Sequence, residues 1–423
     1  MIPESFIQEL LNRVDIVDVI DRSVPLKKAG ANYSACCPFH NEKSPSFTVS
    51  PTKQFYHCFG CGAHGSAIGF VMEYQGLSFV EAINELAKQV GMIVPQETRE
   101  RDADAPQKKA VPGMVEAMQQ AVLYYRGELK KSQRAIEYLK GRGLSGQIAA
   151  RFQMGYAPSG WQNLQEVFSD YQDDVLKSIG LVIENEQGRR YDRFRGRVMF
   201  PIHDQKGQVI GFGGRVLGTE GNDDGPKYLN SPETPLFQKG QELYGLFLAR
   251  RAIRDAGRVL VVEGYMDVVA LAQYGIEYAV AALGTATTPV HITKLMRQTD
   301  EIVFCFDGDA AGRKAAWRAA MNALPALTDG LRLSFLFLPA EHDPDSYVRE
   351  YGKEAFEAAM QTALPLSQYL IQHLSEDNGL QSQEDKVRFL NEAEPILAQI
   401  QAPRLALLLR KRVAELAGLS DEE

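Results

Sequence analysis

Between about residues 241 and 340, short apolar runs alternate with amphipathic stretches. The apolar runs are rich in β-branched and aromatic residues and predict strands, whereas the amphipathic stretches predict helices. The expected strands are 258–262, 278–283, 301–306 and 331–338. The expected helices are 266–274, 290–298 and 311–324. Apolar strands separated by helices predict a parallel sheet covered on both faces, with ligand sites beyond the carboxyl ends of the strands.

Acidic residues follow three of these strands: Glu263, Asp307, Asp309, Asp343 and Asp345. Carboxylates this close repel one another unless a cation lies between them. Mg²⁺ is the usual cation, because it prefers one or two carboxylates together with phosphate oxygens. The pattern therefore predicts a metal-dependent phosphoryl-transfer site.

Outside this region the pattern is mixed. Segments 114–131 and 135–140 have helical periodicity, and strands 197–202 and 209–216 predict a hairpin. Residues 363–418 predict helices in which we find no chemistry.

The 423 residues are 45% hydrophobic and 24% charged, which is ordinary for a soluble globular protein. No run approaches the roughly 18 apolar residues of a membrane span. The N-terminus, MIPESFIQELLNR, predicts an amphipathic helix containing acids, which argues against a signal peptide. We therefore expect a cytoplasmic protein.

The net charge of −8 hides a basic region between Arg189 and Arg215. Its bases are Arg189, Arg190, Arg193, Arg195, Arg197, Lys206 and Arg215. Only Asp192 and Asp204 oppose them. A solvated surface explains any single arginine equally well, but the group as a patch favours phosphate binding.

Cysteine and histidine pairs near the N-terminus have metal-ligand spacing. Cys37-Pro-Phe-His40 and Cys58-Phe-Gly-Cys61 are separated by 17 residues. Three thiolates and an imidazole predict a closed, tetrahedral structural zinc site in a reducing compartment. Cys36 is the alternative to Cys37 as the first ligand. The pattern would otherwise be reduced cysteines in a small core with surface histidines.

Aromatic residues surround this cluster, among them Phe39, Phe47, Phe55 and Phe59. Beside lysines such residues suit base stacking in single-stranded nucleic acid. A small domain also needs them for its core, and the sequence leaves both interpretations open.

The fold class that follows is a multidomain chain of α+β and α/β type. Residues 99–113 are charged, aperiodic and contain Pro, so they predict a flexible linker. The expected divisions are a small zinc-ribbon-like domain at 1–100, a linker at 101–113, a basic mixed α/β subdomain at 114–240, a parallel-sheet α/β subdomain at 241–340 and a helical subdomain at 341–423.

Three motifs together resemble a known family. Glu263-Gly-Tyr-Met-Asp267, Asp307-Gly-Asp-Ala-Ala-Gly-Arg313 and Asp343-Pro-Asp345 are similar to the Toprim domain of topoisomerases, primases and some nucleases. With CPFHNEKSPSF and FYHCFGCGAHG, the chain resembles a bacterial replicative (DnaG-type) primase with a CHC2-type zinc-binding domain over essentially its whole length. RVMFPI and KYLNSPET are similar to that family's core.

The resemblance implies a nucleotidyltransferase that makes short RNA primers de novo on single-stranded DNA during chromosome replication. Glu263, Asp307 and Asp309 would be the catalytic Mg²⁺ ligands, supported by Asp343 and Asp345. Two metals, with Mn²⁺ as an alternative, would activate the attacking hydroxyl and the leaving group. Glu263 acting as the proton acceptor, and Asp343 serving only as a turn residue before Pro344, stay open.

The family's template and nucleotide contacts correspond to Arg142, Arg195, Arg197, Arg215, Lys227 and Tyr228. Its substrates are a single-stranded DNA template and ribonucleoside triphosphates, and single-stranded DNA-binding protein is a further partner. The Gly-rich run Gly211–Gly214 lacks P-loop spacing, and we interpret it as a strand that lets nucleic acid approach the backbone.

One departure from the family is expected at the C-terminus. The helicase-binding domain that normally follows would be absent, because the chain ends at Glu423. The chain would then be a fragment, or helicase coupling would lie elsewhere. Two other functions fit the sequence less well. A Toprim strand-passage enzyme or nuclease would need a transesterifying Tyr or extra acids, which nothing in the sequence marks. A zinc module that only binds nucleic acid would not need the acidic residues.

Overall fold

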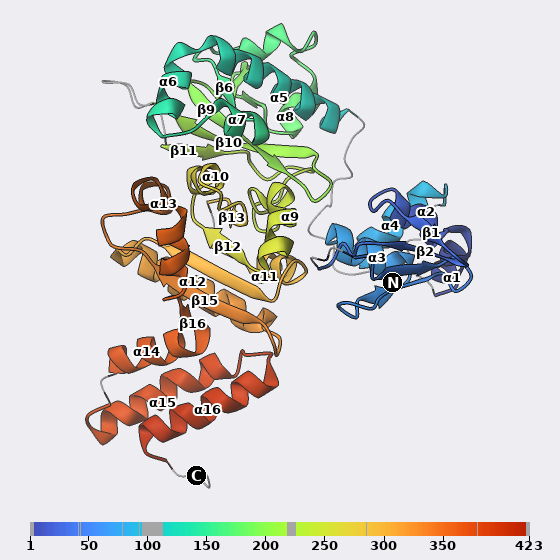
Figure 1. Ribbon diagram of the computed structural model, residues 1–423. Coiled ribbons are helices and arrows are strands. Elements are labelled where there is room, and N and C mark those ends of the chain that lie inside the picture. Colours follow the sequence, from blue (N-terminus) through green and yellow to red (C-terminus); the bar gives the residue numbers. More distant parts are fainter. Residues whose placement is uncertain are drawn as a thin grey trace. The chain divides into compact units, whose positions relative to one another are not determined.

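The computed structural model describes residues 4–40, 42, 44–77, 79–92, 94, 113–217, 226–284, 286–378 and 380–419. The chain forms two compact units, Met1–Gln107 and Lys108–Glu423 (Figure 1). Of the expected linker, residues 101–112 lie outside the described residues. Each unit is therefore considered by itself.

The first unit contains an antiparallel sheet in the order β1–β2–β3–β4–β5. Its strands are β1 (Lys27–Ala29), β2 (Asn32–Ala35), β3 (Phe47–Ser50), β4 (Phe55–Cys58) and β5 (His64–Gly65). Its helices are α1 (Glu4–Arg13), α2 (Ile16–Asp21), α3 (Ala67–Gln75) and α4 (Phe79–Gln89). Phe47 and Tyr56 are fully buried and their rings stack at 5.2 Å. Phe47 is thus a core residue, whereas Phe59 is 76% exposed.

The second unit begins with a mixed α/β part around a sheet in the order β11–β10–β9–β6. Its strands are β6 (Gly155–Ala157), β9 (Arg197–His203), β10 (Val209–Val216) and β11 (Tyr228–Asn230), with a separate pair β7 (Val182–Glu184) and β8 (Arg190–Asp192). Its helices are α5 (Met114–Lys131), α6 (Gln133–Gly141), α7 (Gly146–Arg151), α8 (Asp174–Ser178) and the 3₁₀ turn η1 (Asn163–Glu166). The expected hairpin is present as β9 and β10, which pair antiparallel.

The Gly-rich strand β10 makes room for aromatic rings. A Cβ at Gly213 would lie 2.5 Å from the Tyr265 ring, and one at Gly211 would lie 3.2 Å from the Phe237 ring. The interpretation that this run opens the backbone to nucleic acid is wrong at these two positions, because protein side chains already occupy the space.

The alternating region folds into a sheet in the order β13–β12–β14–β15–β16. The first four strands pair in parallel and the edge strand β16 is antiparallel. Its strands are β12 (Val259–Val262), β13 (Ala279–Ala281), β14 (Glu301–Phe306), β15 (Arg332–Phe337) and β16 (Leu364–Pro365). Its helices are α9 (Leu246–Ala256), α10 (Tyr265–Gln273), α11 (Pro289–Met296), α12 (Ala310–Ala323), α13 (Pro344–Met360) and the 3₁₀ turn η2 (Leu324–Ala326).

The chain ends in the helices α14 (Leu366–Asn378), α15 (Gln383–Leu397) and α16 (Pro403–Ala417). The first packs on the sheet, where the Tyr369 ring lies 4.6 Å from that of Phe335. The other two pack against each other beyond it (Figure 1). None of the helices in the described ranges is long and apolar enough to cross a membrane.

Candidate catalytic cavity and metal centre

Parallel pairing brings the first two acids to one edge of the sheet. β12 and β14 are parallel neighbours in which Val261 lies opposite Phe304, so both strands end at the same edge of the sheet. Glu263 follows the first strand and Asp307 follows the second. Gly308, between the two aspartates, lies so close to the chain after β15 that a Cβ would be 2.1 Å from the Leu338 carbonyl oxygen. Glycine is therefore required at this position.

Asp309 and Asp343 begin helices at the same edge. Asp309 is the N-cap of α12 and accepts a hydrogen bond of 2.7 Å from the Gly312 amide. Asp343 is the N-cap of α13 and accepts one of 2.7 Å from the Ser346 amide. One carboxylate oxygen of each residue is thus fixed, which orients the other oxygen.

Asp345 faces a different partner from the other acids. Its side chain is fully buried and forms an ion pair with Arg142, at the end of α6. It does not line the cavity at the sheet edge. Arg142 binds only Oδ2 of this carboxylate, and Oδ1 has no hydrogen-bond partner among the described residues, so a magnesium role for Asp345 stays a prediction.

A cavity of about 320 Å³ joins this sheet edge to the β9–β10–β11 sheet. Four acids line it on one side: Glu263, Asp267, Asp307 and Asp343. Expected nucleotide contacts line it on the other: Arg142, Arg215, Lys227 and Tyr228. The structure thus gathers residues more than a hundred positions apart in the sequence around one space.

The acids of the cavity perturb one another. Desolvation raises the pKa of Glu263, and the charges of Asp307 and Asp309 raise it further. Desolvation also raises the pKa of Asp307, with Asp343 and Asp309 adding to the effect. Among the described residues, none of Glu263, Asp307 and Asp309 forms an ion pair with Lys or Arg. The raised pKa values of Glu263 and Asp307, together with three carboxylates that lack a cationic partner, fit a donor set for a hard divalent cation.

The cationic side of the cavity is held together by stacking. Arg215 donates a hydrogen bond to the Tyr228 hydroxyl, and its guanidinium lies 5.2 Å from the centre of that ring. Lys227 is exposed beside them. A guanidinium, an ammonium group and an aromatic face are what a nucleotide's phosphates and base require.

Two of the expected nucleic-acid contacts lie outside the cavity. Arg197 is 4% exposed, and its guanidinium donates to the carbonyl oxygens of Gly214 and Pro226 at 3.2 and 2.8 Å. The expectation that Arg197 contacts nucleic acid does not fit this burial, and we assign it a structural role. Arg195 is partly exposed and stacks 4.2 Å over Trp161, a side chain that is itself 63% exposed.

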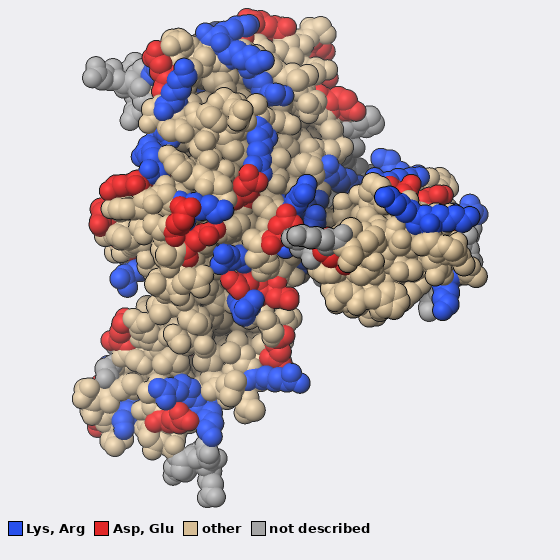
Figure 2. All heavy atoms as spheres, in the orientation of Figure 1, with Lys and Arg blue, Asp and Glu red and all other residues tan. Residues whose placement is uncertain are grey.

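Figure 2 shows that acidic and basic side chains are interspersed over the visible face of the larger unit. On this face, the acidic residues behind the net charge of −8 are therefore not gathered into one patch.

The expected zinc ligands come together in the first unit. The ligand atoms of Cys37, His40, Cys58 and Cys61 all lie within 4.8 Å of one another. The Cys37 and Cys61 sulfurs are 3.8 Å apart, and Cys58 Sγ is 3.7 Å from His40 Nδ1. Cys36 is exposed and does not belong to this group, so the C-x₂-H register is the one the fold uses.

The local backbone prepares one of these ligands, Cys58, whereas burial raises the pKa of Cys37. Burial raises the pKa of Cys58, but hydrogen bonds from Ser46 and from the amides of Cys61 and Gly60 outweigh it and lower the value to about 6. A thiolate is the form that binds zinc. At Gly60 a Cβ would lie 2.5 Å from His40 Nε2, so this turn also requires glycine.

Two further residues at these sites were not among the predicted site residues, although both lie inside motifs that carry the resemblance. Glu42 Oε2 lies 3.2 Å from His40 Nε2, which leaves Nδ1 directed at the cysteines. Asn230 lines the cavity and accepts a 2.6 Å hydrogen bond from Tyr265. Both are single polar residues whose partners are set by tertiary folding, so no spacing rule identifies them.

Comparison with known families covers both units. Residues 2–102 match the CHC2 zinc finger, 124–250 the N-terminal domain of the DNA primase catalytic core and 260–348 a Toprim-like domain. Residues 367–422 match the DnaB-helicase binding domain of primase. The chain is also 59% identical to the DNA primase of Neisseria meningitidis over its whole length, covering 71% of that protein.

The chain belongs to the bacterial DNA primase family.

Other relatives agree with this assignment. The primase is 53% identical to the DNA primase of Pseudomonas aeruginosa and 50% identical to that of Escherichia coli K12, covering 64% and 72% of those proteins. The whole chain is matched in each comparison. The chain therefore functions as a DNA primase.

Solved structures match both units of the primase. A primase domain from Pseudomonas aeruginosa is 51% identical, with a TM-score of 0.69, and covers 73% of this chain and 97% of its own. The zinc-binding and RNA polymerase domains of the Aquifex aeolicus primase are 34% identical, with a TM-score of 0.62, and cover 98% of this chain and 97% of their own. The predicted fold class is confirmed, and the zinc finger and Toprim-like matches support a structural zinc and the use of a divalent metal.

The prediction that the helicase-binding domain is absent is wrong. Residues 367–422, which include α15, α16 and all but the first residue of α14, match that domain. Periodicity predicted these helices, but a surface that binds another protein needs no catalytic residue types at fixed spacing. The pattern therefore gave no sign of the helicase partner.

Proposed function

We propose that this primase joins ribonucleoside triphosphates by nucleotidyl transfer on a single-stranded DNA template and so makes short RNA primers de novo at the replicating chromosome in the cytoplasm. The observation that carries the proposal is the 320 Å³ cavity, which faces an acidic sheet edge with a cationic and aromatic wall. One relative of known structure, 47% identical, is a DnaG primase catalytic domain bound to single-stranded DNA, and its TM-score is 0.68.

The acidic edge would hold the catalytic metals. Glu263, Asp307 and Asp309 would bind two Mg²⁺ ions, or Mn²⁺ as an alternative, with Asp343 beside them. The ions would supply charge neutralisation and Lewis acidity at the reacting phosphate. The fixed oxygens of Asp309 and Asp343 mean that part of the ligand geometry is set before any ion binds.

The opposite wall would bind the nucleotide. Arg142, Arg215 and Lys227 are placed to hold phosphates, and the Tyr228 ring offers a stacking face. Asp345 would keep Arg142 in position through their ion pair. In the first unit, Cys37, His40, Cys58 and Cys61 would hold one structural zinc.

The test is primer synthesis with single-stranded DNA, ribonucleotides and Mg²⁺. We expect Glu263→Gln to lower the rate by orders of magnitude, because a metal ligand is lost, while folding and DNA binding stay near those of the unchanged chain. Glu354→Gln, at an exposed position on α13, is the matched control. Primer synthesis by Glu263→Gln at the control's rate would refute the assignment of this acid.

A further inference from the structure

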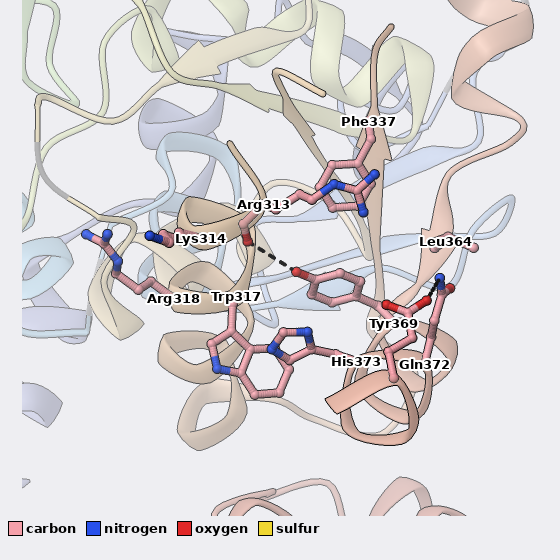
Figure 3. Close-up of a pocket in the computed structure, with 10 residues that line it drawn as sticks. Arg313, Lys314, Trp317, Arg318, Phe337, Leu364, Tyr369, Gln372 and His373 are labelled. Carbon is pink, nitrogen blue, oxygen red and sulfur yellow. Dashed lines mark hydrogen bonds between the residues drawn. The ribbon is translucent and has the colours of Figure 1, made fainter. Parts of the chain in front are cut away.

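A second, larger cavity lies between α12 and α14. Its volume is about 600 Å³, and its lining shares no residue with that of the catalytic cavity. One wall is the exposed face of α12, the other is α14, and side chains of β15 and β16 contribute between them (Figure 3). Cavities of roughly 300–1,000 Å³ are the size that holds small ligands.

One wall of this cavity is cationic. Arg313, Lys314 and Arg318 all line it and all are exposed. Within the described part of the chain, none of the three forms an ion pair. The Arg313 guanidinium lies 5.6 Å from the centre of the Phe337 ring, while Lys314 and Arg318 are one helical turn apart on the same face. Three cations without counterions on one wall favour a polyanionic ligand.

The space between the walls is lined by aromatic rings. The rings of Trp317 and His373 lie 3.9 Å apart, joining one helix to the other (Figure 3). Tyr369 is 8% exposed, and its hydroxyl donates to the backbone oxygen of Arg313 at 3.4 Å. These fixed rings offer flat apolar surface for stacking.

A single acid stands among the lining residues. Glu376 accepts a hydrogen bond of 2.8 Å from Gln372, and both side chains line the α14 wall. A carboxylate repels an acidic peptide, but it accepts hydrogen bonds from an amino-substituted base. Guanine offers two adjacent N–H donors, and the Gln372 amide can donate or accept beside them. The composition of the cavity thus fits a base and its phosphates better than a peptide.

We propose that this cavity binds a free nucleoside polyphosphate with an amino-substituted base, outside the catalytic cavity. The base lies among Trp317, Tyr369 and His373, with its amino edge on Glu376, and the phosphates lie along Arg313, Lys314 and Arg318. The volume suits one nucleotide rather than a strand, which is why the free nucleotide is the ligand.

The cavity lies between two segments that match different families, so a bound ligand would contact both. The α12 wall belongs to the Toprim-like segment, residues 260–348, and the α14 wall to the helicase-binding segment, residues 367–422. A nucleotide in the cavity would bridge the two segments. Binding in this cavity involves no catalysis, so a test of binding is separate from a test of the proposed reaction.

The test uses the protein's own fluorescence. The chain has two tryptophans, Trp161 and Trp317, so Trp161→Phe leaves the cavity tryptophan as the only reporter. GTP is titrated into the full chain carrying Trp161→Phe, without Mg²⁺, with excitation where guanine absorbs little. We expect saturable quenching, with UTP binding more weakly because it has no amino group for Glu376.

Variants then locate the site. Lys314→Glu should weaken GTP binding at least about tenfold, because an attraction to phosphate becomes a repulsion. Glu376→Gln should reduce the preference for GTP over UTP. Arg410→Ala, an exposed cation on α16, is the matched control and should bind GTP as the parent does. Hydrogen exchange of 310–318 and 366–376 should slow together when GTP is added.

Three outcomes would overturn the proposal. They are no quenching by GTP, quenching that Lys314→Glu leaves unchanged, and quenching by a single-stranded oligonucleotide but not by GTP. The last would assign the cavity to a nucleic-acid strand instead.

Discussion

At the residue scale, the first unit depends on four ligands whose spacing is visible in the sequence. We expect Cys61→Ala to lose the zinc and to leave residues 1–100 sensitive to protease, because such a site contributes folding free energy directly. Metal analysis and limited proteolysis measure the two effects. Cys36→Ala, the neighbour that the ligand group excludes, should keep one zinc per chain. Zinc lost from Cys36→Ala, or kept in Cys61→Ala, would show that the ligand register is wrong.

Individual side chains divide into those the sequence could place and those it could not. Glu263 and Asp307 follow apolar strands directly, so the expected parallel sheet predicted their common edge. Asp345 is two residues from Asp343 and has the same charge, yet it is buried against Arg142, 203 positions away. Arg197 resembled a surface cation, but carbonyl oxygens of Gly214 and Pro226 hold it inside. Spacing carries no information about such distant partners.

At the element scale, the ion pair between Arg142 and the buried Asp345 joins the end of α6 to the first turn of α13. Arg142→Met should lower the free energy of unfolding by about 3 kcal/mol, because it leaves a buried carboxylate without its partner. Denaturant unfolding measures the loss. The double variant Arg142→Met/Asp345→Leu should recover most of it and still make primers poorly, since Arg142 also lines the catalytic cavity. Equal instability of the single and double variants would contradict this role of the pair.

Elements with a long, regular pattern were predictable, and short edge elements were not. The run 301–306 predicted β14 with its observed bounds, and the helical period of 114–131 did the same for α5. The two-residue strand β16 has no period of its own and exists because its backbone pairs with β15. Pairing partners of this kind are chosen by the folded sheet, so sequence pattern alone could not identify them.

At the scale of the whole molecule, the zinc ligands and the exposed Phe59 ring lie in one unit and the acidic edge lies in the other. We expect residues 112–423 alone to bind DNA weakly and to initiate poorly, and residues 1–111 added as a separate chain to restore initiation in part. The restoration should be incomplete, because joining the units in one chain raises their effective concentration. Primer yield against the concentration of the added unit measures this. Full initiation by residues 112–423 alone would contradict the division of labour.

The five thiols of the chain differ in their surroundings, so their reactivity toward an alkylating reagent reports whether each unit is folded. Cys36 is exposed and stands outside the ligand group, while Cys305 is buried in β14, where burial raises the pKa of its thiol. An alkylating reagent added to the native, zinc-loaded chain should modify Cys36 first, because three sulfurs are ligands and Cys305 is shielded. A chelator should expose the three ligand thiols, and only denaturant should expose the last. The mass of the labelled chain would then tell, for any preparation or variant, which of the two units has come apart.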